Sequence, residues 1–228
     1  MLAIHSALST RMGTILCALI VVTCTIGLTM HRDFYACRIR KDFFCFYTNI
    51  SNLIVLIYFA AISPRLYISK TLEPLIPHVE FAVTMQILLT LSVFHLVLFP
   101  AVRKTIEKMP HTRAYMIVCT DNLFIHYLVP LLVLVYWVFC APGKDRLTFG
   151  DALYWTAIPT LYAAYIFIRA PLCGRIEEAG SAYPYPFMDI QVLGGRRVAA
   201  YCTLLYITGA AAGLAMIALT RMIYLFHG

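Results

Sequence analysis

Long apolar runs separated by short polar stretches dominate the chain, and their lengths predict membrane-spanning helices. A hydrocarbon core about 30 Å thick requires about 20 apolar residues in helical conformation. Six stretches meet this requirement, at residues 13–30, 43–63, 81–100, 122–140, 152–168 and 198–220. The connections contain turn residues such as Ser63-Pro64 and Pro142-Gly143, which end helices. The pattern predicts an all-α integral membrane fold, a compact six-transmembrane-helix bundle that forms a single polytopic domain over residues 1–228.

Composition favours the same interpretation. Of 228 residues, 61% are hydrophobic and 13% charged, with a mean hydropathy of +0.80. Soluble domains contain about 45–50% apolar and about 25% charged residues, so disordered, collagen-like and ordinary cytosolic classes are excluded. The eight cysteines are scattered without a C-x-x-C pair, which indicates neither a disulfide framework nor a zinc site. We therefore expect no metal and no cofactor.

The basic surplus predicts an orientation in the membrane. The net charge is +7, and of the 18 Lys and Arg residues twelve lie in the first, third and fifth loops. Cytoplasmic loops carry an excess of Lys and Arg, so the odd-numbered loops are predicted to be cytoplasmic and both termini outside. The membrane would be the plasma membrane, or the inner membrane in a bacterium. Because the basic residues orient the spans, we expect no nucleic-acid partner.

Polar groups within the apolar runs are the candidate functional residues. Ionisable groups inside a membrane are costly and usually face the bundle interior, and the six runs contain only His95 and His126. The densest uncharged cluster is in the second run, where Thr48, Ser51 and Asn52 share one helical face at i, i+3 and i+4. With a rise of 1.5 Å per residue, Thr48 and the two histidines lie about 6–8 Å inside the odd-loop ends of their spans. The three groups are therefore predicted to share one layer.

A hydroxyl and an imidazole in one layer indicate nucleophilic catalysis. A threonine hydroxyl attacks a carbonyl only when a base removes its proton, and imidazole has a suitable pKa. We expect Thr48 to be the nucleophile and His126 the base. Side-chain or backbone donors would stabilise the developing oxyanion, and neighbours one turn away would orient the imidazole. The supporting residues are expected to be Ser51, Asn52, Asn122, Asp121 and His95. The fifth loop opens on the same side and is expected to cover the layer or face the substrate with Tyr185 and Asp189.

Structural roles are an alternative for the same residues. Threonine, serine and asparagine in membrane helices commonly bond to their own backbone or join helices, and histidines near span ends are often satisfied interior groups. Aromatic residues near span ends are typical of the interfacial belt, and a proline within a span distorts its helix. These expectations concern Tyr136, Trp137, Tyr154, Trp155 and Pro130.

Other functions remain open at this point. A bis-histidine haem electron carrier would use His95 and His126 as axial ligands. A non-enzymatic protein that binds or transports a lipid or small solute would use the polar layer as its binding site. The sequence contains no G-x-S-x-G, H-E-x-x-H or phosphate-loop motif, so no other enzyme class is indicated.

Three short motifs resemble a known family. FYTNISN at 46–52, HYLVP at 126–130 and YPFMD at 185–189 are similar, in order and spacing, to the androgen-induced protein family of six-span membrane hydrolases, including its bacterial-type relatives. The resemblance implies a threonine hydrolase that cleaves fatty acid esters of hydroxy fatty acids taken from the bilayer. It places the nucleophile at Thr48 and the catalytic histidine at His126. The family is described with cytosolic termini, opposite to the orientation that the charge count favours.

Overall fold

The computed structural model describes residues 2–31, 42–62, 75–110 and 113–227, and within these ranges the regular structure is helical apart from one isolated bridge between Ile176 and Ser181. The chain divides into two units. Unit 1 contains Met1–Arg40 and Thr48–Lys144, and unit 2 contains Lys41–Tyr47 and Asp145–Gly228. The prediction of a single membrane domain stays a prediction.

Five helical segments among the described residues are long and apolar enough to cross a membrane. They are Arg11–Met30, Ile76–Lys104, Cys119–Phe139, Asp151–Cys173 and Gly195–Met222. Each overlaps one of the predicted apolar runs. The all-helical class is confirmed, and so is the membrane-spanning length of these five runs.

The second predicted run begins later than expected. Residues Phe43–Cys45 form a short 3-10 turn, Phe46 is extended (φ −104°, ψ 125°), and helix α2 starts at Tyr47. The Cys45 carbonyl accepts a hydrogen bond from Tyr162 Oη at 2.8 Å rather than continuing a helix. The predicted start at residue 43 is therefore wrong. The apolar helix here, Tyr47–Ala60, is shorter than the other five, and the predicted end at Ser63 lies outside the described residues.

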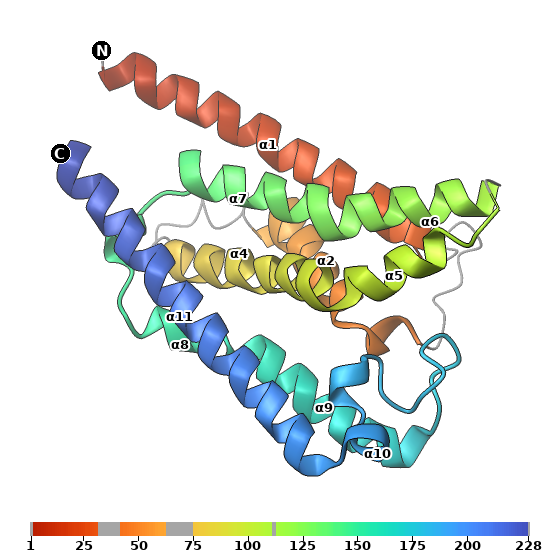
Figure 1. The fold of residues 1–228 in the computed structure, drawn as a ribbon. Helices are drawn as coiled ribbons and strands as arrows, with labels where there is room; N and C mark the ends of the chain where they lie inside the picture. The colour runs from red at the N-terminus through yellow and green to blue at the C-terminus, as the bar shows by residue number, and fades with distance from the viewer. Residues whose placement is uncertain (1, 32–41, 63–74, 111–112, 228) are drawn as a thin grey trace. The chain divides into compact units, whose positions relative to one another are not determined.

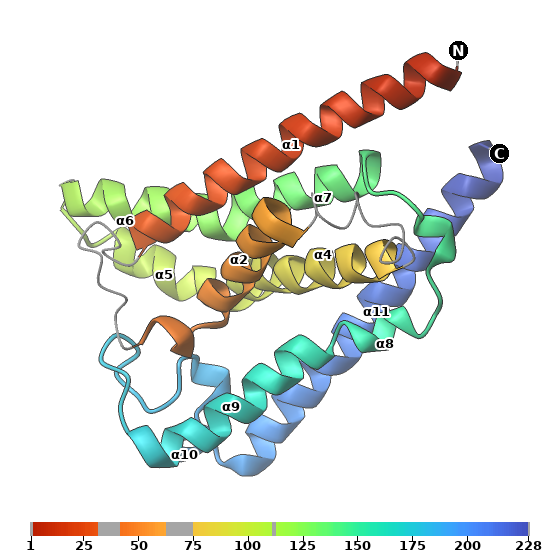
Figure 2. The ribbon, with the colours of Figure 1, turned by 180° about the vertical axis from the view of Figure 1, so that it is seen from behind.

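Unit 1 is built around α1, α2, α4, α6 and α7 (Figure 1). Helix α1 (Leu2–His31) packs against α6 (Arg113–Leu123) and α7 (Val129–Phe139), and α4 (Ile76–Val93) packs against α7. A Cβ at Gly27 would lie 2.6 Å from Ile125 Cγ2, so a glycine is needed for this approach of α1. Helix α2 (Tyr47–Ile57), seen in Figure 2, is bonded to α4 and to the segment before α7 by side chains described below.

Two π-helical turns interrupt the long helices of unit 1. Turn η5 (Phe94–Leu98) joins α4 to α5 (Phe99–Ile106), and turn η6 (Phe124–Leu128) joins α6 to α7. Pro100 and Pro130 each follow a turn by two residues. Proline has no N–H and its ring collides with the carbonyl four residues earlier, and widening to a π turn is one way a helix accommodates this conflict. The expected distortion at Pro130 thus takes the form of a π turn.

The same spacing occurs three times in the sequence, as an aromatic residue, three residues, an aliphatic residue, one residue and proline. It reads YFAAISP at 58–64, FHLVLFP at 94–100 and FIHYLVP at 124–130. A third π turn, η3 (Tyr58–Ile62), occupies the first of these. The proline spacing therefore accounts for where each helix widens.

Unit 2 contains α8 (Asp151–Tyr154), α9 (Ala157–Cys173), the short α10 (Ile190–Leu193) and the long α11 (Gly195–His227). Helix α8 packs on α11, where Trp155 covers Gly209 and Gly213.

The expected aromatic belt is wrong for three residues. Tyr136, Trp137 and Trp155 are buried, with 3%, 2% and 3% of their surface exposed, whereas Tyr154 is 74% exposed. Glycines provide the space for Trp155, and Trp137 packs against Phe81 with ring centroids 5.6 Å apart. Packing within the helices therefore outweighs the interfacial preference at these positions.

We expect Gly213→Ala to destabilise unit 2. A Cβ at Gly213 would lie 2.9 Å from Trp155 Nε1 and 3.2 Å from Ala152 Cα, and overpacking of this kind costs about 1–3 kcal/mol. Gly195→Ala is the matched control, because a Cβ there meets nothing within 4 Å in the same helix. Thermal unfolding in detergent, followed by Trp fluorescence, should show a lower Tm only for Gly213→Ala. Equal Tm values for the two variants would contradict this packing.

Candidate functional site

The polar face of α2 is buried inside unit 1. Thr48 is 7% exposed, and Asn49, Ser51 and Asn52 are fully buried. A buried polar side chain is costly unless a hydrogen bond satisfies it. The hydrogen-bond partners of these residues therefore show which segments the polar face of α2 joins.

Ser51 connects α2 to α4. Its Oγ donates to the Thr48 carbonyl at 2.9 Å and lies 2.8 Å from Thr90 Oγ1, and its carbonyl accepts from Gln86 Nε2 at 3.1 Å. Gln86 and Thr90 were not predicted, because neither is ionisable. The available signal was their spacing, since Gln86, Thr90 and Phe94 follow one another at four-residue intervals on α4 and η5.

Asn52 connects Thr48 to the segment that carries His126. Its Nδ2 donates to the Thr48 carbonyl at 2.8 Å and to the Ile125 carbonyl at 3.1 Å. Cys24 on α1 donates its thiol to the Asn52 carbonyl at 3.0 Å. Both amide hydrogens of Asn52 are therefore in use, and the side chain would have to release one of them to serve as an oxyanion donor. The geometry favours a positioning role.

The π turn η6 explains why the Ile125 carbonyl is available to Asn52. In an α-helix this carbonyl would accept from the N–H of Val129, but Val129 donates instead to Phe124, five residues earlier. The next backbone nitrogen is that of Pro130, which has no hydrogen. The Asn52 amide fills the vacancy, so Pro130 and Asn52 together link α2 to η6.

His126 is buried and its ring is fixed by packing. It is 5% exposed and stacks on Phe94, with ring centroids 3.6 Å apart and planes 11° apart. Phe94 belongs to η5 and is itself 3% exposed. The two π turns therefore face each other, and one supplies the surface on which the imidazole of the other rests.

His95 does not share this interior environment. Its side chain is exposed, its Nδ1 lies 3.0 Å from Tyr127 Oη, and its ring is nearly parallel to that of Phe99 at 5.9 Å. The expectation that span histidines face the interior is wrong for His95. Because the two histidines face different surroundings, an arrangement with both as axial haem ligands gains no support from the geometry.

Asp121 and Asn122 lie one turn before His126. Asp121 is 7% exposed, and its Oδ1 accepts from the backbone N–H of Asn122 at 2.6 Å. Asn122 is half-buried. Their expected role in orienting the imidazole stays a prediction.

Tyr185 and Asp189 belong to unit 2. The Asp189 carboxylate begins α10 as an N-cap, accepting from the N–H groups of Gln191 and Val192 at 2.9 and 3.1 Å and from Ser181 Oγ at 2.5 Å. Tyr185 stacks on Phe187 with centroids 5.4 Å apart. These contacts give both residues local structural roles. The expectation that they cover the catalytic layer or face the substrate stays a prediction.

A second buried polar cluster was missed. Glu80 on α4 is 2% exposed and accepts from Tyr136 Oη at 3.2 Å. Nearby, Lys144 Nζ donates to the Trp137 and Val138 carbonyls at 2.9 and 2.8 Å, and burial lowers the pKa of this lysine. Glu80 lies one residue before the predicted third run, whereas the helix itself begins at Ile76. Helix α4 is longer than its apolar run, so the carboxyl falls within the span.

No family model, no curated protein and no solved structure matches this chain. Its function therefore has to be inferred from the residues and their geometry.

Proposed function

We propose that the protein is a six-span integral-membrane hydrolase that cleaves lipid esters, with Thr48 as nucleophile and His126 as general base. One observation carries the proposal. A single amide, Asn52 Nδ2, bonds the carbonyls of Thr48 and Ile125, and so holds a buried hydroxyl residue beside the residue that precedes a buried imidazole. Catalysis by a weak nucleophile depends on this kind of fixed proximity.

The reaction would proceed in two halves. Thr48 Oγ attacks the acyl carbonyl carbon while His126 takes the hydroxyl proton, and the tetrahedral oxyanion collapses as His126 returns that proton to the leaving alkoxide. The alcohol departs and the acyl group remains on Thr48. In the second half, the oxygen of a water molecule attacks the acyl carbon while His126 takes a proton from that water. The proton then passes to the Thr48 oxygen as the carboxylic acid leaves. A backbone N–H would stabilise the oxyanion in both halves, because the Ser51 hydroxyl already donates to the Thr48 carbonyl.

A lipid ester is the substrate class that the surroundings favour. Five helices are long and apolar enough to cross a membrane, and Thr48 and His126 are buried, with 7% and 5% of their surface exposed. The ester would enter from the lipid phase with its acyl chains between spans. The motif resemblance to the androgen-induced protein family supports fatty acid esters of hydroxy fatty acids as the specific class.

The proposed orientation places the first, third and fifth loops in the cytoplasm. It depends on the distribution of Lys and Arg along the sequence. The basic residues of the first two loops lie outside the described residues. The catalytic layer would then open toward the cytoplasmic face.

Labelling with a fluorophosphonate probe tests the nucleophile. Thr48→Ala should abolish labelling, because no other hydroxyl would be activated by His126, and Thr48→Ser should retain it. Thr25→Ala is the matched control, since Thr25 is an exposed threonine of α1 whose Oγ1 bonds the Val21 carbonyl of its own helix at 2.8 Å. Undiminished labelling of folded Thr48→Ala protein would remove Thr48 as nucleophile, and loss in Ser51→Ala alone would transfer the role to Ser51.

A second candidate function is binding or transport of a small polar solute. It is favoured by four buried polar residues that follow α4 through the span, with exposures of 3% or less: Glu80, Thr84, Gln86 and Thr90. Solute flux into liposomes that persists in Thr48→Ala protein would support this function over hydrolysis.

A further inference from the structure

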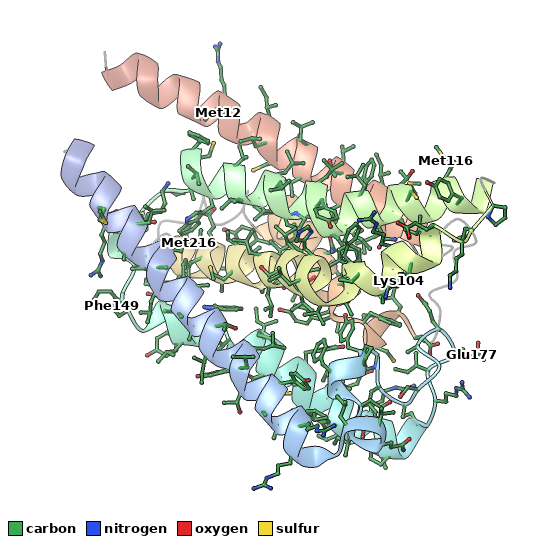
Figure 3. All side chains as sticks on the ribbon, viewed as in Figure 1. Met12, Lys104, Met116, Phe149, Glu177 and Met216 are labelled. Atoms are coloured by element: carbon green, nitrogen blue, oxygen red, sulfur yellow. The ribbon has the colours of Figure 1, made fainter. Side chains whose placement is uncertain are left out.

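His95 is a polar residue on the outer, apolar surface of a membrane-spanning segment. Its neighbours Leu96 and Val97 are 74% and 46% exposed. The segment extends to Lys104, which lies in the last turn of α5 (Figure 3). Lys104 lies nine positions after His95, which corresponds to about 13 Å of helix. The imidazole is therefore exposed well inside the apolar region, where ionisable groups are rare and mark functional positions.

The hydrogen bond to Tyr127 leaves His95 one unused polar atom. Nδ1 lies 3.0 Å from Tyr127 Oη, whereas Nε2 has no hydrogen-bond partner among the described residues. When Tyr127 donates to Nδ1, the neutral imidazole carries its proton on Nε2. That N–H is a hydrogen-bond donor directed away from its tyrosine partner, in surroundings with few acceptors.

A continuous aromatic path connects this surface pair to the buried imidazole. Phe94 stacks on His126 at 3.6 Å and meets the Tyr127 ring edge-on at 5.7 Å, with the planes 84° apart. Each π turn contains a buried residue followed by a more exposed one. The pairs are Phe94 and His95 in η5, and His126 and Tyr127 in η6. The surface pair is thus adjacent, through Phe94, to the proposed catalytic base.

We propose that His95 and Tyr127 form a surface binding site for the ester group of a membrane-dissolved acyl lipid, through which the substrate reaches Thr48 and His126. The inference rests on the proposed hydrolase function and extends it to the route of substrate access. An acyl ester is the fitting occupant because it supplies a carbonyl oxygen to accept the Nε2 hydrogen and acyl chains to lie on the exposed apolar residues beside it. Phe94 then separates the held ester from the catalytic layer.

Photo-crosslinking measures this binding without turnover. The probe is a long-chain fatty acyl ester with a diazirine beside the ester group, in phosphatidylcholine vesicles containing Thr48→Ala protein. We expect crosslinks to peptides containing residues 94–99 and 124–128. His95→Phe or Tyr127→Phe should reduce them about tenfold, the order expected for one lost hydrogen bond. Ser92→Ala is the matched control, because Ser92 is an exposed polar residue of α4 whose Oγ bonds the Leu88 carbonyl of its own helix.

The outcomes separate this site from the hydrolase. Equal crosslinking in His95→Phe and Ser92→Ala overturns the binding site. Loss of crosslinking in His95→Phe supports the site even if fluorophosphonate labelling has removed Thr48 as nucleophile. In active protein, His95→Phe should raise KM about tenfold for a long-chain p-nitrophenyl ester and leave kcat unchanged. A fall in kcat with no change in KM would overturn the binding role.

Discussion

His126→Phe is expected to lower ester turnover by on the order of 10³-fold while the protein stays folded. The phenyl ring preserves the stacked contact with Phe94, where the present centroids are 3.6 Å apart, and it suits a position only 5% exposed. What the substitution removes is the nitrogen that accepts the Thr48 proton in the first half of the reaction and the proton of the attacking water in the second. Turnover of a long-chain p-nitrophenyl ester in detergent measures the loss, and the thermal unfolding curve verifies the fold.

His78→Phe is the matched control for this variant. His78 is a half-buried histidine in the first turn of α4, two residues before Glu80 and 16 residues before Phe94. Its replacement should leave turnover close to that of the wild type. Turnover retained by folded His126→Phe protein would exclude His126 as the general base.

Apolar periodicity was sufficient for the helical class and for five of the spans, because run length alone determines whether a helix can cross a membrane. It failed at the start of the second run, where Tyr162 bonds the Cys45 carbonyl across 117 residues of sequence. The run FFCF at residues 43–46 has no local feature indicating that the Cys45 carbonyl accepts a hydrogen bond from a tyrosine far along the chain. The boundary at Tyr47 therefore could not be predicted from the run itself.

Thr48 and His126 are both buried, whereas His95 is exposed. The prediction for His95 rested on the tendency of ionisable groups in a span to face the interior and on a depth computed from the rise per residue. Neither argument determines which face of the helix a side chain occupies. A π turn contains an additional residue and so changes which side chains face inward on either side of it, and His95 and His126 both lie within such turns.

The positions of the π turns were nonetheless encoded locally. The recurring spacing from an aromatic residue to proline at 58–64, 94–100 and 124–130 accompanies all three π turns of the described chain. What the sequence alone leaves undetermined is the partner of each released carbonyl. Asn52 bonds that of Ile125 across 73 residues, and such a pairing depends on tertiary packing rather than on local pattern.

Pro130→Ala is expected to reduce turnover by about 10- to 100-fold without lowering the Tm. Alanine restores a backbone N–H and removes the collision that a proline ring makes with the carbonyl four residues earlier, so the segment can close into a regular α-helix. The N–H of Val129 would then return from Phe124 to the Ile125 carbonyl, in competition with Asn52. Displacement of a catalytic group by about 1 Å costs about 100-fold in rate, whereas the helix itself gains from the loss of an interior proline.

A double-mutant cycle between Pro130→Ala and Asn52→Leu tests this coupling. If Asn52 acts by bonding the carbonyl that Pro130 leaves available, removing either residue breaks the same link, and the double variant should lose little more activity than the worse single variant. Pro142→Ala is the control, since Pro142 is an exposed proline in the loop after α7. Losses that multiply in the double variant would show that the two residues act independently. In that case the π turn η6 would affect turnover by placing the His126 ring against Phe94 rather than by supplying an acceptor to Asn52.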